Sequence, residues 1–70
     1  MTEQEKLDRI ADVLDADAGV LTASTELDEI CWDSMGMLSV IALAKTNGKT
    51  IAGAEIRTFK TVGDILNAAF

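Results

Sequence analysis

The chain has 70 residues and a formal net charge of −6, with a sequence pI near 4.2. We expect one domain over residues 1–70, because this length supports only one small hydrophobic core. The acidic balance disfavours nucleic acid as a partner, since both surfaces would carry negative charge. One cysteine and no histidine exclude an intramolecular disulfide framework and a zinc site of the Cys/His type, and we expect no metal site.

The start of the chain and its hydropathy predict where the protein resides. Thr2, Glu3, Gln4 and Glu5 are polar or acidic, unlike a secretory signal. The longest nearly apolar run, residues 35–44, is too short to span a bilayer. A lone cysteine fits a reducing compartment. We therefore expect a cytoplasmic monomer without membrane insertion.

Residues 3–14 have the pattern of an amphipathic helix. Thr2 and Glu5 have the spacing of a capping box. Four apolar residues recur at i, i+3, i+4 and i+7, namely Leu7, Ile10, Ala11 and Leu14. Asp8, Asp12 and Asp15 form an acidic stripe, which is either a solvated face or a docking surface for a basic partner.

Residues 15–33 show no sustained periodicity and predict a long loop. So long a connection in a small domain is unusual unless it is functional or held down by side chains. We expect the loop to lie across the bundle, with one short helical turn near residues 27–31. The side chains expected to hold it are Val20, Leu21, Leu27 and Ile30.

Residues 34–46 predict a second helix, which Asn47 and Gly48 end. Leu38 and Ile41 are expected on one face, and Met35, Val40 and Leu43 elsewhere. The helix is apolar nearly all round, so part of its surface must meet solvent or a partner. Gly36 lowers the stability of a helix by about 0.5–1 kcal/mol relative to alanine. It either lets a partner or an attached group approach the backbone closely or has no functional role.

Two further helices complete the expected fold. Residues 51–57 favour a short helix, and Thr61 with Asp64 predicts a capping box before a last helix. That last helix presents Val62, Ile65, Leu66 and Ala69 at i, i+3, i+4 and i+7, with Phe59 and Phe70 filling the bundle ends. The sequence thus predicts an all-α, small four-helix bundle, with three longer helices, one short third helix and a long loop between helices 1 and 2.

Ser34 stands at the predicted junction between the long loop and the second helix. There its hydroxyl would be exposed, and a phosphate attached to it would meet first-turn N–H groups that have no intrahelical partner. The competing interpretation is that Ser34 or Asp33 only caps the helix. The junction alone leaves both open.

Three stretches of the chain resemble the acyl carrier protein family. Asp33-Ser34-Met35 resembles the Asp-Ser-Leu attachment motif of acyl and peptidyl carrier proteins. The run Thr25-Glu26-Leu27-Asp28-Glu29-Ile30 resembles the acidic segment that precedes that motif. Residues 51–59, followed by Lys60-Thr61-Val62-Gly63-Asp64-Ile65-Leu66, resemble the family's short third helix and the start of its fourth. Together these stretches extend the resemblance over nearly the whole chain.

The resemblance implies that a 4′-phosphopantetheine arm, derived from coenzyme A, is attached covalently to the Ser34 hydroxyl. It implies a carrier that is not an enzyme and that delivers acyl intermediates as thioesters, for fatty-acid-like or specialised biosynthesis. Its partners would be a phosphopantetheinyl transferase and acyl-transferring or condensing enzymes. The alternatives are an aminoacyl or peptidyl carrier, and an unmodified helical interaction module.

The chain lacks the means to activate Ser34 itself. A serine nucleophile needs an adjacent base, usually histidine, and the chain has none. We therefore expect the base and the metal to come from the transferase. The Asp33 charge would orient that enzyme or lie near its metal, beside or instead of capping the helix.

The second helix departs from the family pattern. Met35 replaces the usual leucine with a side chain of similar volume. No carboxylate follows Asp33 in residues 34–46, where the family commonly presents acidic residues. We therefore expect partners to bind through Met35, Met37 and Val40, with weak salt dependence.

The remaining expectations concern cargo and two neighbours of the motif. An acyl chain between the helices would be lined by Leu38, Ile41, Ile56 and Ile65. Cys31 is expected to be a semi-buried spectator, because no cationic neighbour in sequence lowers its pKa. Trp32 is expected to pack against the bundle and fix the loop.

Overall fold

A computed structural model gives the fold and describes residues 2–17, 19–30 and 32–70. The expectation for Cys31 therefore lies outside the described residues. The elements in chain order are α1 (Glu3–Val13), η1 (Leu27–Glu29), α2 (Ser34–Thr46), α3 (Gly53–Ile56) and α4 (Val62–Ala69). Over these residues the structure is helical and free of strands, which confirms the predicted small all-α bundle.

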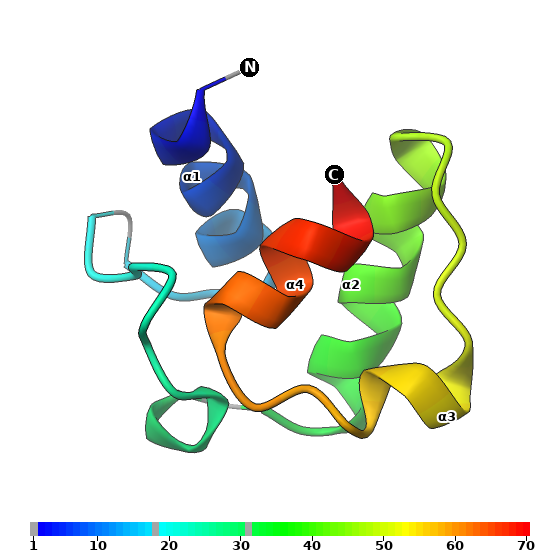
Figure 1. The fold of residues 1–70 in the computed structure, drawn as a ribbon. Helices are drawn as coiled ribbons and strands as arrows, with labels where there is room; N and C mark the ends of the chain where they lie inside the picture. Colours follow the sequence, from blue (N-terminus) through cyan, green and yellow to red (C-terminus); the bar gives the residue numbers. More distant parts are fainter. Residues whose placement is uncertain (1, 18, 31) are drawn as a thin grey trace.

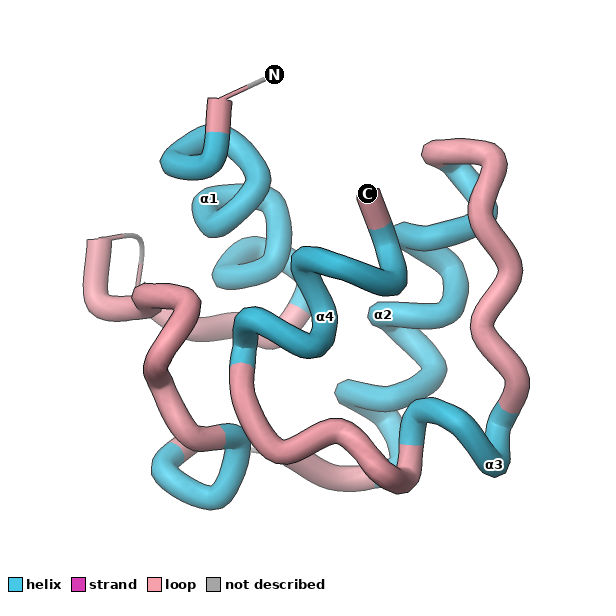
Figure 2. Tube along the Cα trace, in the orientation of Figure 1, coloured by secondary structure: helices cyan, strands magenta, loops and turns pink. Residues whose placement is uncertain are grey.

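The three longer helices pack against one another, and α3 lies to one side. Contacts join α2 to α4, α1 to α2 and α1 to α4. Figures 1 and 2 show α2 running from the end of the molecule near α3 towards the end that carries both termini. The first residue of α2 therefore lies at the end of the bundle where the long loop and α3 meet.

Side chains set the start of two helices as the sequence predicts. Thr2 and Glu5 form a capping box at α1, and Thr61 and Asp64 form one at α4. The two N–H groups of Lys60 and Thr61 both donate to Asp64 Oδ2, at 2.8 and 3.1 Å. These bonds, that from Lys60 first, lower the pKa of Asp64 because they stabilise its ionised form.

A Schellman motif ends each of the first two long helices. After α2, Gly48 has φ 76°, and Lys49 N–H donates to the Ala44 carbonyl at 2.8 Å. After α1, the residue in the left-handed region is Asp15, with φ 56°. The predicted stop at Gly48 is confirmed, and α1 ends at Val13, one residue before the predicted boundary.

The core is apolar throughout the described residues. No described polar or charged side chain is buried. The buried residues are Leu7, Ile10, Ala11, Leu14, Leu21, Leu27, Val40, Leu43, Ala44, Ile51, Ile56, Val62, Ile65 and Ala69. Trp32, Phe59 and Phe70 pack half-buried against this core, in the roles that the sequence predicts.

The rotational phase of α2 differs from the prediction. Its buried residues are Gly36, Val40, Leu43 and Ala44, spaced i, i+4, i+7 and i+8. Val40, expected to contact partners, is thus turned towards the core, whereas Leu38 is 66% exposed. Two of the four buried residues, Gly36 and Ala44, are small, so this face of α2 adds little side-chain volume to the core.

The long loop is fastened to the connection between α3 and α4 by three backbone hydrogen bonds, which we call the strap. Leu27 N–H donates to the Lys60 carbonyl at 2.8 Å, Val62 N–H to Thr25 at 2.9 Å, and Gly63 N–H to Ala23 at 2.9 Å. Around them, residues 26 and 61 form an isolated antiparallel bridge. The strap satisfies backbone groups that the irregular loop could not pair within itself.

Two of the four predicted loop anchors are buried. Leu21 and Leu27 enter the core, and Leu27 begins the predicted short helical turn, η1. Ile30 is half-buried. Val20 is 62% exposed, so the prediction that it holds the loop is wrong. The strap fixes the chain at residues 23–27, and the apolar residues that reach the core are Leu21, just before it, and Leu27, at its end.

Replacing Gly63 with alanine tests the strap. A Cβ at this position would lie 2.9 Å from the Ala23 carbonyl oxygen, which is too close without movement of the backbone. We expect Gly63→Ala to lower the free energy of unfolding by about 1–3 kcal/mol, as overpacking does. Urea denaturation followed by circular dichroism measures the change.

The matched control is Gly53→Ala, where a Cβ meets nothing within 4 Å. This substitution should raise the free energy of unfolding by about 0.4–1 kcal/mol, since alanine restricts the unfolded chain. Equal effects of the two substitutions would contradict the role given to the strap.

Candidate functional site

Ser34 is the first residue of α2, and its side chain is exposed. Asp33, the N-cap, has an extended backbone and ends the loop. The structure thus places the Ser34 hydroxyl at a helix start and on the surface, as the sequence predicts. This end of a helix bears a partial positive charge, which favours an anion close to it.

Asp33 satisfies two donors at the start of α2. Its Oδ1 accepts the Gly36 N–H at 2.9 Å, and its carbonyl accepts the Met37 N–H at 2.9 Å. The N–H groups of Ser34 and Met35 donate to no acceptor within residues 2–17, 19–30 and 32–70. Helix capping by Asp33 is therefore observed, and the Ser34 and Met35 N–H groups belong to the helix end that has no intrahelical partners.

A shallow apolar groove begins at Ser34 and runs between α2 and α3; we call it the α2–α3 groove. It has a volume of about 180 Å³. Its lining residues are Ser34, Met37, Leu38, Ile41, Gly53, Ile56 and Arg57. The α2 members follow i, i+3, i+4 and i+7 spacing from Ser34, so one face of the helix carries both the hydroxyl and the groove wall.

Arg57 is the one cation among the lining residues of this groove, and it is exposed. It directly follows α3, and no pattern in the sequence assigns it to the same groove as Ser34. A guanidinium is permanently charged and presents several donors suited to phosphate oxygens. It does not serve as a base, so the groove supplies no group that could take the Ser34 proton.

Three of the four predicted cargo-lining residues belong to the groove. Leu38, Ile41 and Ile56 line it. Ile65 is fully buried in the core and does not line this groove, so its expected contact with cargo stays a prediction. The core-facing side of α4 is closed by α1 and α2, which explains why Ile65 does not reach the groove.

The predicted partner-contact residues have different exposures. Met35 is 76% exposed, and Met37 is half-buried. Val40 has 0% exposure and lies in the core, so the prediction that a partner contacts it is wrong. Val40 is buried because the rotation of α2 about its axis turns this side chain towards the core. Leu38, at 66% exposure, takes the place on the surface that was expected for Val40.

The charges near the junction lie on the loop and not on α2. Asp28 and Glu29 are exposed on η1, and Asp33 is exposed at the helix start. Lys45, in the last turn, is the only charged residue of α2. Electrostatic attraction of a basic partner would therefore act from beside the helix and not along it.

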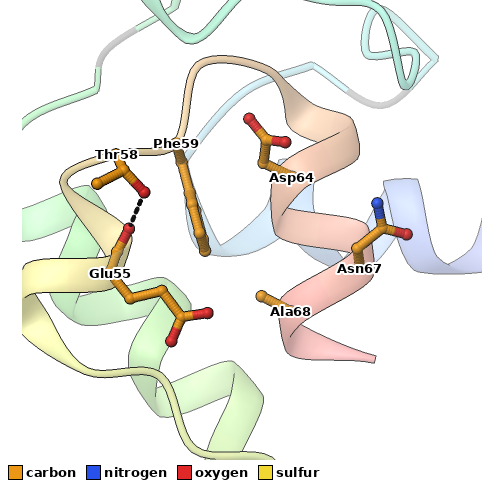
Figure 3. A pocket seen from close by; sticks show the side chains of 6 residues that line it. All are labelled: Glu55, Thr58, Phe59, Asp64, Asn67 and Ala68. Atoms are coloured by element: carbon orange, nitrogen blue, oxygen red, sulfur yellow. Dashed lines mark hydrogen bonds between the residues drawn. The ribbon is translucent and has the colours of Figure 1, made fainter.

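A second hollow, of about 330 Å³, lies between α3 and α4. It is lined by Glu55, Thr58, Phe59, Asp64, Asn67 and Ala68 (Figure 3). Asp64 is engaged in the α4 cap, and Thr58 Oγ1 donates to the Glu55 carbonyl at 2.6 Å. These bonds stabilise the helix ends, and the hollow contains no pairing of a nucleophile with a base.

No group of three or more His, Cys, Asp or Glu side chains that could hold a metal ion occurs within the described ranges. None of the described helices combines the length and the hydropathy required to cross a membrane. Comparison of the chain with protein-family models, with curated proteins and with solved structures found no match.

Two substitutions at Asp33 test its capping role. Asp33→Ala removes the acceptor of the Gly36 N–H and should cost about 1 kcal/mol. In a domain of this size, that corresponds to a fall in Tm of about 4–8 °C. Asp33→Asn keeps a good N-cap side chain and should change Tm little. Thermal unfolding measures both, and an equal fall in the two variants would refute capping as the stabilising role.

Proposed function

We propose that the protein is a non-catalytic acyl carrier, which bears a 4′-phosphopantetheine arm on the Ser34 hydroxyl. The observation that carries this proposal is the exposed Ser34 hydroxyl on the first residue of α2, beside the first-turn N–H groups of Ser34 and Met35. Those donors and the positive end of the helix favour a phosphodiester at this oxygen. The choice of 4′-phosphopantetheine as the attached group comes from the resemblance of Asp33-Ser34-Met35 to the carrier motif.

The arm supplies a terminal thiol on which acyl intermediates travel as thioesters. The chain's own part is to present Ser34 and to hold its surroundings open. Attachment forms a bond between Ser34 Oγ and phosphorus and breaks the pyrophosphate bond of coenzyme A, and the nucleotide part leaves. A phosphopantetheinyl transferase supplies the base that takes the Ser34 proton and the metal that binds the pyrophosphate, because the chain contains no histidine.

The exposed pair Met35 and Leu38 supports an apolar contact with partner enzymes, next to the attachment point. Such partners are the transferase and acyl-transferring or condensing enzymes. With no carboxylate in α2 after Asp33, contact along this helix has little salt dependence, because it depends on apolar burial and not on ion pairs.

One observation favours a second candidate, an aminoacyl or peptidyl carrier. The surface of α2 lacks the acidic residues that acyl carriers commonly present, and its one charge is basic. Both candidates share the Ser34 arm and differ in cargo and partners. An unmodified interaction module is the third candidate and is separated from them by mass. In each case we propose a cytoplasmic monomer that binds neither nucleic acid nor membrane, from its acidic charge and lone cysteine.

Incubation with a phosphopantetheinyl transferase, coenzyme A and Mg²⁺ tests the proposal. Intact-mass spectrometry should show one added 4′-phosphopantetheine on the wild-type chain and none on Ser34→Ala. Ser39→Ala is the matched control, because Ser39 lies in the same helix and its Oγ donates to the Met35 carbonyl at 3.0 Å. It should be modified like the wild type. An unmodified wild-type chain that gives the circular dichroism of a folded helical domain would overturn the proposal.

A further inference from the structure

The C-terminal end of α2 carries the dipeptide Asn47-Gly48, at the far end of this helix from Ser34. Asparagine is a chemically labile residue, because the backbone nitrogen of the next residue can attack its side-chain carbonyl carbon. Glycine as the next residue favours this attack, since it has no side chain to shield its nitrogen or to restrict its backbone. Asn47 and Gly48 are both exposed, so water reaches them.

The Asn47 side chain joins α2 to the end of α4 (Figure 1), in a contact that we call the α2–α4 tie. Asn47 Nδ2 donates to the Ala69 carbonyl at 2.9 Å, across a separation of 22 residues. Every other side-chain hydrogen bond within the described ranges joins residues at most four positions apart. Ala69 is the last residue of α4, so its carbonyl has no partner within its own helix. The tie therefore pairs an acceptor that α4 cannot pair itself.

Hydrogen bonds of the folded chain restrain both groups that would react. The Gly48 N–H donates to the Lys45 carbonyl at 3.1 Å, within the Schellman motif that ends α2. The Asn47 amide is engaged in the tie. Before the two groups can react, the Gly48 nitrogen must give up its hydrogen and the Asn47 side chain must turn back onto its own backbone. Both changes break bonds of the folded chain, so the reaction requires a local opening at this end of α2.

We propose that Asn47 is a site of spontaneous deamidation, which opening of the α2–α4 tie permits and which then abolishes the tie. The Gly48 nitrogen forms a bond to Asn47 Cγ and loses its proton, while the bond from Cγ to Nδ2 breaks and ammonia leaves. Water then opens the resulting succinimide ring, which gives aspartate or isoaspartate. The net change is the loss of one ammonia and the gain of one water, and the reaction uses no oxidant or reductant.

The product cannot restore the tie. A carboxylate has no N–H to donate, so two acceptor oxygens would face each other where Asn47 now meets Ala69. The new negative charge also lies at the C-terminal end of α2, which bears a partial negative charge of its own. Isoaspartate in addition lengthens the backbone by one carbon inside the motif that ends α2. The modification therefore frees the last turn of α4 and leaves the Ser34 hydroxyl unaltered, so this inference does not depend on the proposed function.

Long incubation of the chain in mildly alkaline buffer, with and without urea, tests the site. Peptide mapping by mass spectrometry should find aspartate and isoaspartate at Asn47. Asn67 is the internal control, because it is exposed within α4 and is followed by Ala68. It should stay unmodified while α4 is folded. Urea should raise the rate at Asn47 several-fold, because unfolding removes both hydrogen bonds that restrain the reaction.

Two phenylalanine variants test whether opening of the tie controls the rate. Phe70 and Phe59 are both half-buried against the core, and Phe70 directly follows Ala69. Phe70→Ala should raise the rate at Asn47 several-fold in the absence of urea. Phe59→Ala acts at the connection between α3 and α4 and should raise the rate less. Urea denaturation gives the stability of each variant, which separates opening of the tie from unfolding of the whole domain.

The variant Asn47→Asp tests the consequence, because it reproduces the aspartate product. It should lower Tm more than Asn47→Ala does, since alanine removes the tie without adding a charge at the end of α2. It should also accelerate hydrogen exchange of the Ala68 and Ala69 N–H groups.

Each part of the inference has a result that would overturn it. An Asn47 that stays unmodified both in buffer and in urea overturns the site. Equal rates in the folded and unfolded chain, or rates in the two phenylalanine variants that follow overall stability alone, overturn control by the tie. An Asn47→Asp variant with the Tm and the exchange rates of the wild type overturns the consequence.

Discussion

The position of the candidate site depends on how an irregular loop is held in a domain with a small core. A chain of 70 residues gains only a few kcal/mol from its core, so unpaired backbone groups in a long loop would be costly. The strap pairs Ala23, Thr25 and Leu27 with residues 60–63 and so lets Leu21 and Leu27 reach the interior. Because of this anchoring, the chain reaches Asp33 extended and at the end of the bundle, where α2 begins.

The face that α2 buries determines the face that it presents. Gly36, Val40, Leu43 and Ala44 pack inward, which turns the face with Ser34, Leu38 and Ile41 towards α3 and solvent. Asp33 fixes the first turn through its side chain and its carbonyl, and the Ser34 hydroxyl makes no hydrogen bond to the residues that the structure describes. A rigid helix start and an accessible hydroxyl are therefore compatible here, as a tethered arm requires.

Local signals in the sequence predicted the bounds of the helices well. They predicted less well which side chains of each helix face the core. The capping boxes at Thr2 and Thr61, and the bounds of α2, follow from residues close together in the chain. The phase of α2 does not, because a helix that is apolar nearly all round has no polar face to fix its rotation. The small residues Gly36 and Ala44 were the available signal, since they mark where helices approach closely. Arg57 was missed because its place in the lining of the groove that contains Ser34 depends on the path of residues 47–61, which no local pattern specifies.

The central claim is that Ser34 carries a phosphopantetheine arm in the cell that makes this protein. Intact-mass spectrometry of the chain purified from those cells, followed by fragmentation, tests it most directly. The account predicts a mass raised by one 4′-phosphopantetheine, free or acylated, with the added mass located on Ser34. A native chain in which Ser34 is found unmodified throughout, with no species bearing the arm, would contradict it.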